Sequence, residues 1–406
     1  MSALLAKIDE IVPDFTGVPT QSDGRVGYQV YGRAYFNPND FKREMVLVGL
    51  SVLYLLVWAV RSLYNKSVVK AWGSVYIPAL KEEFSYVPEK TPYGSGSFVW
   101  DGVGEATLYA SGRRYVESLQ ATFHFYPWHD GVLLLAQQAG SLSVAGQYKF
   151  EDQRSRLTIE ITLPQSGDNV CGVFGLVNKR WLAQTRTGRR FDLSFGQLAD
   201  GENASAQRGL SDQWAILSES GELTDVWLGV TGVRGGSTRD RIGIQQVLNT
   251  PAAEKWLESI IITDQPRVRP TKGALLPEDR PRQVVVTLQV PTTAADARAT
   301  LPFVALALNI ADAIGLAGGN SPNAPVRFRP ELLTKIRKTR KEVDVLLEEE
   351  AHREEKEAEE EALRDAKAKS ENERFKNLSS AEQAKRKEIE RKRALKKGQK
   401  TMRARA

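Results

Sequence analysis

MVLVGLSVLYLLVWAV, which fills residues 45–60, is a run of sixteen residues without a charged side chain. A helix needs about 20 residues to cross the hydrocarbon core of a bilayer. The sequence up to Tyr64 supplies that length when Arg61 extends its guanidinium group to the lipid headgroups. All faces of the helix are apolar and both flanks are charged, so the sequence predicts a membrane span over residues 45–64. A buried core helix or a re-entrant segment is the alternative. The residues that carry the prediction include Met45, Leu47, Leu50, Leu53, Tyr54, Leu56, Trp58 and Val60.

The segment before the span is not expected to be a cleavable signal peptide, because its first 15 residues carry Lys7, Asp9, Glu10 and Asp14. The span should therefore act as its own signal anchor, with residues 1–44 as a short luminal segment. Basic residues are slightly more numerous after the span than before it, which points the C-terminal side to the cytosol. N-glycosylation acceptors test this orientation, because they are used only in the lumen. These acceptors are Asn65, Asn203 and Asn377.

Residues 65–328 are expected to form a cytosolic domain of the α+β class. Its clearest strand is LTIEITL, in which Leu157, Ile159, Ile161 and Leu163 recur at every second position, as in a half-buried sheet. Strands and helices mix without a regular βαβ alternation. The expected strands are Ser97–Trp100, Glu105–Ala110, Ser118–Phe125, Leu157–Leu163, Asn169–Gly175 and Arg282–Val290. The expected helices are Lys70–Phe84 (interrupted at Pro78), Asp130–Gln138, Asp212–Ser218, Arg241–Leu248, Pro251–Ile260 and Ala294–Leu316.

A second membrane span is the alternative for residues 294–316. Their apolar core, LPFVALALNIADAIGL, is short for a span and contains Pro302, Asn309 and Asp312. We therefore predict a buried helix that covers the sheet.

The sequence offers no constellation of residues for catalysis, cofactor binding or metal binding. His124 and His129 lie five residues apart, but no further ligand follows at a spacing typical of zinc sites. Gly235-Gly236 lacks the P-loop pattern, and Ser218 lacks the G-x-S-x-G pattern of a nucleophilic serine. Cys171, the single cysteine, permits no intrachain disulfide and is expected to fill a small space in the core. We therefore expect a protein that is not an enzyme.

Residues 329–406 predict a long charged helix with a basic tail, because they contain neither Gly nor Pro between Glu331 and Gly398. Residues 342–361 contain eleven acids and two bases, a net charge of −9. Residues 385–405 contain eleven bases and two acids, a net charge of +9. No sustained heptad of apolar residues is present, so a solvated single helix is expected rather than a self-pairing coiled coil.

The basic tail has the charge density that binding to a nucleic-acid backbone requires, and no aromatic residue that would stack on bases. Binding to anionic lipid, a localisation signal and simple solvation are the alternatives. The candidate RNA-binding residues are Lys385, Arg386, Lys387, Arg391, Lys392, Arg393, Lys396, Lys397, Lys400 and Arg403.

Several motifs, taken in their order along the chain, resemble a known family. A single span is followed by LYASGRR (residues 108–114), AILSESGELTD (215–225), ESIIITDQ (258–265), VVVTLQVP (284–291) and a charged helix with basic clusters. This order is similar to that of the calumin family, the coiled-coil subunit of the PAT complex in the endoplasmic reticulum. AILSESGELTD is the most specific of the motifs. The resemblance covers most of residues 45–406.

The resemblance implies a single-pass protein of the endoplasmic reticulum membrane that acts with the ribosome-bound translocon for multipass membrane proteins. It implies a small membrane partner, Asterix, a Sec-type translocon, and client transmembrane segments that the complex shields. It also implies that the basic tail reaches ribosomal RNA near the tunnel exit. The calcium binding linked to a long acidic luminal segment is not expected here, because the acids among residues 1–44 are few and scattered.

The first functional hypothesis is therefore a chaperone and scaffold of membrane-protein biogenesis. The second is a lipid-contact or tethering protein whose basic helix binds anionic membranes. Sedimentation with ribosomes, compared with binding to liposomes, separates the two. A membrane-anchored enzyme is a third class, for which the sequence has no motif.

Overall fold

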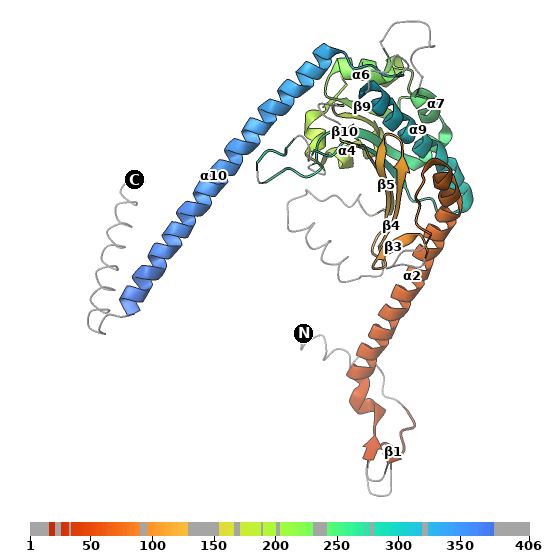
Figure 1. Cartoon of the computed structure of the whole chain (residues 1–406). Coiled ribbons are helices and arrows are strands. Elements are labelled where there is room, and N and C mark those ends of the chain that lie inside the picture. The colour runs from red at the N-terminus through yellow and green to blue at the C-terminus, as the bar shows by residue number, and fades with distance from the viewer. Residues whose placement is uncertain are drawn as a thin grey trace, which may run out of the picture. The chain divides into compact units, whose positions relative to one another are not determined.

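The computed structural model describes the chain in twelve segments, shown as coloured ribbon in Figure 1. The chain divides into two compact units, one of residues 1–268 and 280–333 and the other of residues 269–279 and 334–406. The described segments are residues 16–20, 26–31, 34–89, 96–128, 154–165, 171–187, 190–199, 204–229, 242–271, 273–276, 280–318 and 324–376.

The first unit begins with a small hairpin and one very long helix. Strands β1 (Tyr28–Tyr31) and β2 (Ala34–Phe36) pair with each other, and the 3-10 helix η1 (Pro38–Phe41) leads into α2 (Lys42–Glu83). The predicted helix of residues 70–84 and the predicted span are therefore one continuous helix, which Figure 1 shows extending from the domain.

Pro78 does not interrupt α2, contrary to the sequence-based expectation. Its ring lies on the exposed side of the helix, where water can satisfy the carbonyl group that lacks a donor.

A nine-stranded antiparallel sheet forms the centre of the domain, in the order β3-β4-β5-β6-β11-β10-β7-β9-β8. In the centre of the sheet, Ile159 of β6 pairs with Val286 of β11. The domain thus combines helices with an antiparallel sheet, as the predicted α+β class requires. The strands are β3 (Phe98–Asp101), β4 (Glu105–Arg113), β5 (Val116–His124), β6 (Arg156–Thr162), β7 (Phe174–Asn178), β8 (Gln197–Leu198), β9 (Trp214–Ser218), β10 (Leu257–Thr263) and β11 (Gln283–Gln289).

The strand LTIEITL was predicted correctly, because its burial alternates along β6. Two predicted helices are wrong. Residues 214–218 form strand β9 rather than a helix, and the helix predicted to end at Ile260 stops at Trp256, where β10 begins. Every residue of β9 and β10 is buried, so neither strand shows the alternation that separates strand from helix in a sequence.

Helix α9 (Ala294–Gly318) packs on strands β11, β6 and β10 of the sheet. It also packs against helix α2. Phe303, Ala307 and Ile310 are buried, as a core helix requires. This position agrees with the prediction of a covering helix. The remaining helices are α4 (Lys179–Thr187), η3 (Asp192–Phe195), α5 (Ala204–Gln207), α6 (Gly221–Leu228), α7 (Ile244–Leu248) and α8 (Pro251–Trp256). The predicted helix Asp130–Gln138 lies outside the described residues.

Helix α10 (Pro330–Lys376) supplies the described helical part of the second unit. Within this unit, Arg269 Nη2 lies 2.5 Å from Glu350 Oε2, which ties the loop after residue 268 to the helix. Residues 377–406, the rest of the predicted charged helix, lie outside the described part of the chain.

Candidate functional site

The N-terminal half of α2 presents apolar side chains to its surroundings on every side. An 18-residue window of this helix has a mean hydropathy of 2.0, and none of the window is buried by the rest of the chain. Leu50, Leu53 and Leu56 each expose more than half of their surface. In water this would be a large unstable apolar surface, whereas in a bilayer it needs no protein partner. All eight residues predicted to span the membrane lie in this exposed half.

The C-terminal half of the same helix belongs to the core of the domain. Trp72, Tyr76 and Leu80 follow one another at intervals of four residues, and each is at most 3% exposed. The Trp72 ring stacks on Tyr76 with centroids 4.0 Å apart and meets Phe123 of β5 edge-on at 5.1 Å. A single rigid helix therefore joins the candidate span to the sheet, with no linker between them.

Asn65 marks the boundary between these two halves. Its side chain is fully buried, and Nδ2 donates a hydrogen bond of 2.8 Å to the carbonyl oxygen of Val103 in the turn between β3 and β4. A glycan on this side-chain nitrogen would not fit the folded domain. The other two acceptors, Asn203 and Asn377, lie outside the described residues.

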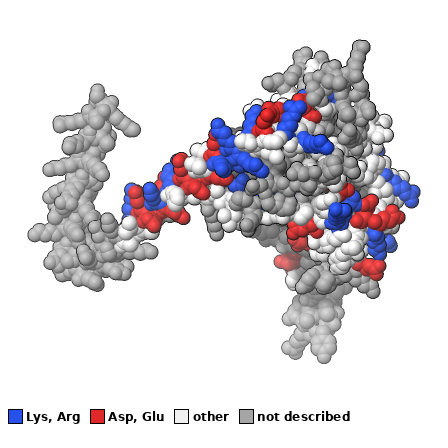
Figure 2. Space-filling view, turned by 45° about the horizontal axis from the view of Figure 1, so that its top comes forward, with Lys and Arg blue, Asp and Glu red and all other residues white. Residues whose placement is uncertain are grey.

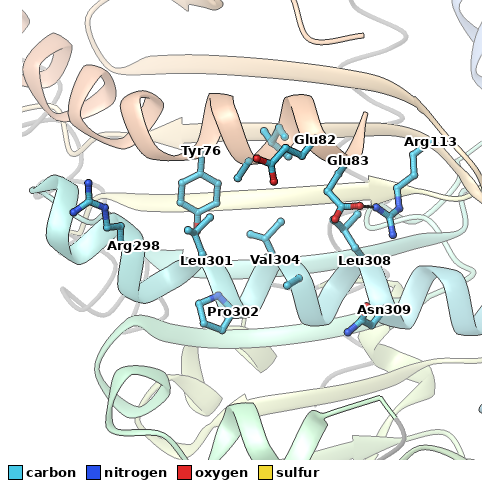
Figure 3. A pocket seen from close by; sticks show the side chains of 13 residues that line it. Tyr76, Glu82, Glu83, Arg113, Arg298, Leu301, Pro302, Val304, Leu308 and Asn309 are labelled. Carbon is cyan, nitrogen blue, oxygen red and sulfur yellow. Dashed lines mark ion pairs between the residues drawn. The ribbon is translucent and has the colours of Figure 1, made fainter. Parts of the chain in front are cut away.

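A groove of about 500 Å³ lies between α2 and α9 in the domain (Figure 3). Its floor is apolar and includes Leu80, Val304 and Leu308. The two helices that form the walls are joined by a buried contact, because the hydroxyl groups of Tyr76 and Thr300 lie 2.8 Å apart. The groove is thus preformed by the core rather than by loops.

Opposite charges stand at the two ends of this groove. Arg113 of β4 pairs with Glu83 of α2 at one end (Figure 3). The Nη2 atom of Arg113 also lies 2.7 Å from Asp312 Oδ2 of α9. Glu82 lies near the same end and Arg298 at the other, and neither forms an ion pair within the described part of the chain. An apolar floor between charged ends suits a short amphipathic protein segment better than a small polar substrate.

Sequence reasoning did not find the groove, because its walls come from segments more than 200 residues apart. The structure shows that the exposed residues of α9 recur at intervals of three, four, three and four residues, which places them along one face of the helix. They are Ala295, Arg298, Pro302, Ala305 and Asn309, and all but Ala295 line the groove.

The motif AILSESGELTD forms the end of a buried strand and the start of α6. Ser220 caps this helix, since its Oγ accepts a hydrogen bond of 3.3 Å from the Leu223 amide. Ser218 donates its hydroxyl proton to the Ser220 carbonyl oxygen at 2.8 Å, and Asp225 pairs with Arg208 at 2.5 Å. The contacts of these polar groups are thus with neighbouring parts of the local fold.

The residues weighed for chemistry are dispersed in the structure. His124 ends β5, where Nδ1 lies 3.6 Å from Glu105 Oε1, and His129 lies outside the described residues. Cys171 is buried, as predicted, although it precedes β7 instead of lying in a strand. Among the described residues, no group of three or more His, Cys, Asp or Glu side chains could hold a metal ion.

The described part of α10 carries both signs of charge along its length, as Figure 2 shows. Pairs such as Glu360 with Arg364, 3.5 Å apart, are exposed and i,i+4 in spacing. The ten candidate RNA-binding residues, from Lys385 to Arg403, all lie outside the described residues. Their role therefore stays a prediction.

Comparison with known proteins places the chain in a family. No curated protein matches the sequence at a significant level. The family model described as PAT complex subunit CCDC47 matches residues 40–397, which include the exposed apolar helix, the whole described sheet and α10. The match agrees with the resemblance drawn from the motifs. The chain therefore belongs to the family of the PAT complex subunit CCDC47.

Proposed function

We propose that this protein is a membrane-anchored, non-enzymatic chaperone and scaffold subunit of the PAT complex in the endoplasmic reticulum. In this role it acts beside the ribosome during the insertion and folding of multi-spanning membrane proteins. Family membership gives a role in the PAT complex and partners in a membrane-protein complex.

The observation that carries the proposal is the continuity of α2. The exposed apolar half and the buried half with Trp72 and Tyr76 are one helix of 42 residues. A domain joined to its span in this way cannot swing freely about the bilayer. A fixed orientation is what a scaffold needs, because every partner must meet the domain at a defined height above the membrane.

The groove between α2 and α9 is the surface that we assign to a partner within the complex. It lies on the same helix as the span, so a segment bound there is held next to the membrane. Asterix and a Sec-type translocon are the partners that we propose, and client transmembrane segments are the substrates that the complex shields.

The basic tail supplies the proposed contact with the ribosome. Its net charge of +9 over residues 385–405 is suited to phosphate groups, whose neutralisation releases counterions. Attachment to a membrane anchor raises the local concentration of this tail near a docked ribosome. This requires the domain and the tail to face the cytosol.

Sedimentation with ribosomes from detergent-solubilised membranes tests the proposal. The full chain is compared with a variant in which Lys385, Arg386 and Lys387 are changed to Gln. Three exposed lysines of α10, Lys335, Lys338 and Lys341, changed to Gln give a control with the same loss of charge. We expect the tail variant to sediment less, with a shallower salt dependence by about one power of salt per lost phosphate contact, and the control to sediment like the wild type.

Three results would contradict this function. Equal loss in the tail variant and the control would show a general charge effect rather than a tail contact. Binding to anionic liposomes without any ribosome association would favour the membrane-tethering alternative. Co-elution of Asterix and the translocon with the wild-type chain is the second readout, and its absence would remove the chaperone role.

A further inference from the structure

We infer that the domain end of the α2 span carries a binding site for one glycerophospholipid, with Arg61 as the partner of the lipid phosphate. The site is an apolar niche of about 380 Å³. It is lined by Leu56, Val57, Val60, Arg61, Tyr64 and Trp128. The inference rests on α2 spanning a membrane, but not on ribosome binding or on the chaperone role.

Two distant parts of the chain build this niche. Five of its residues lie on α2, where spacings of one, three and four residues place them on one side of the helix. The sixth, Trp128, follows the end of β5 and lies against that side of α2. Its position is held by its amide, which donates to the Tyr126 carbonyl oxygen at 2.8 Å, and by an edge-on contact of the two rings at 4.9 Å. The niche is therefore a built feature of the fold.

Arg61 provides the polar end of the niche. Its guanidinium carbon lies 4.8 Å from the centre of the Tyr64 ring, which fixes the direction of the side chain. Its Nε is buried and has no hydrogen-bond partner among the residues that the structure describes. Since the protein covers Nε, the terminal nitrogens of Arg61 are the donors for a ligand, and a phosphate oxygen is the acceptor that a guanidinium group pairs with best.

The remaining lining matches the rest of a phospholipid. Leu56, Val57 and Val60 belong to the exposed apolar half of α2, where an acyl chain would lie. Trp128 exposes 58% of its surface although it is the largest side chain in the niche. Indole and phenol rings gather at the level of lipid headgroups, so Trp128 and Tyr64 place the membrane interface beside Arg61.

Native mass spectrometry of the detergent-purified full-length protein tests the site. Purified chain is incubated with a defined phosphatidylcholine or phosphatidylserine, and bound lipid is counted as mass adducts. The variants are Arg61→Gln, Trp128→Ala and Lys66→Gln. Lys66 is an exposed cation on the same helix, close to Arg61, and it does not line the niche, so it serves as the matched control.

We expect the wild type and Lys66→Gln to retain one phospholipid of either headgroup, because the phosphate is common to both. Arg61→Gln should lower the occupancy about tenfold, as expected for loss of a hydrogen bond between charged groups. Trp128→Ala should lower it as well, by opening the niche. Equal retention by all four proteins overturns the site and leaves the niche to a protein helix. Equal loss in Arg61→Gln and Lys66→Gln overturns it in favour of diffuse attraction between charges.

Resistance of each protein to alkaline extraction from membranes separates this site from the anchor. A chain that is extracted has no span, which removes the basis of the whole proposal. A chain that stays in the membrane while Arg61→Gln binds lipid normally refutes the lipid site alone.

Discussion

The hydroxyl groups of Tyr76 and Thr300 meet at 2.8 Å in the core of the domain and join the long helix α2 to α9. Thr300 donates its own proton to the Ala297 carbonyl oxygen at 2.7 Å, so Tyr76 is the donor between the two hydroxyls. Burial raises the pKa of Tyr76 above its ordinary value, and the phenol therefore remains protonated as a donor. The packing of α2 on α9 thus includes a hydrogen bond inside an apolar core.

Removing this contact should weaken the domain without unfolding it. Tyr76→Phe keeps the ring that stacks on Trp72 and should lower the free energy of unfolding by about 1 kcal/mol. Thr300→Val should lower it by about 1–3 kcal/mol, because it leaves the buried Tyr76 hydroxyl without an acceptor. Denaturant unfolding of the detergent-solubilised protein measures both. The double variant should lose less free energy of unfolding than the sum of the losses in the two single variants. If the losses are strictly additive, the two hydroxyl groups do not interact.

Arg113 links β4, α2 and α9, and its replacement should destabilise the protein more than the replacement of an exposed arginine. Its side chain is 16% exposed and pairs with Glu83 of α2 and Asp312 of α9. Arg113→Gln should destabilise the domain by about 1–2 kcal/mol, since two carboxylates lose a charged partner. Arg364→Gln, which removes an exposed i,i+4 pair, is the control and should cost about 0.5 kcal/mol or less. Thermal unfolding compares them, and equal shifts would mean that Arg113 does not hold α2 against α9.

The sequence predicts those parts of the fold in which one face of an element differs from the other. In β6, Ile159 and Ile161 alternate with polar residues, and the strand was predicted almost to the residue. In β9 and β10 both faces are buried, so Trp214–Ser218 and Leu257–Thr263 carry no alternation and read equally well as helix. Only their neighbours in the sheet decide between the two.

The candidate site was predicted unevenly for a similar reason. The exposed apolar half of α2 is a local property of residues 45–64 and was identified directly. The groove and the niche are made by contacts over long separations, such as that of Trp128 with the Val60 region of α2, which no local pattern records. The charge split of the C-terminal segment is visible in the sequence, whereas what it binds depends on a partner outside the chain.

Filling the groove should disrupt assembly while preserving the fold. Ala305 is exposed in the groove wall, so Ala305→Trp adds bulk where a partner segment would lie. We expect co-purification of the PAT complex partners to fall about tenfold, as a clash of a little over 1 kcal/mol would produce. Thermal unfolding of the variant should match that of the wild type.

Ala362→Trp, at an exposed position of α10, is the control for this substitution and should not alter co-purification. Equal partner recovery with Ala305→Trp would show that the groove is not an interface of the complex.

A charge at the centre of the exposed half of α2 should prevent membrane integration. Leu53 lies near the middle of residues 45–64, and arginine at the centre of a span costs about 2.5–3.5 kcal/mol on insertion scales. Leu53→Arg should therefore lose most of its resistance to alkaline extraction. Leu363→Arg, at an exposed leucine of α10, adds the same charge outside the span and should remain integrated. If Leu53→Arg stays in the membrane like the wild type, the apolar half of α2 does not lie in hydrocarbon, and a protein partner must cover it instead.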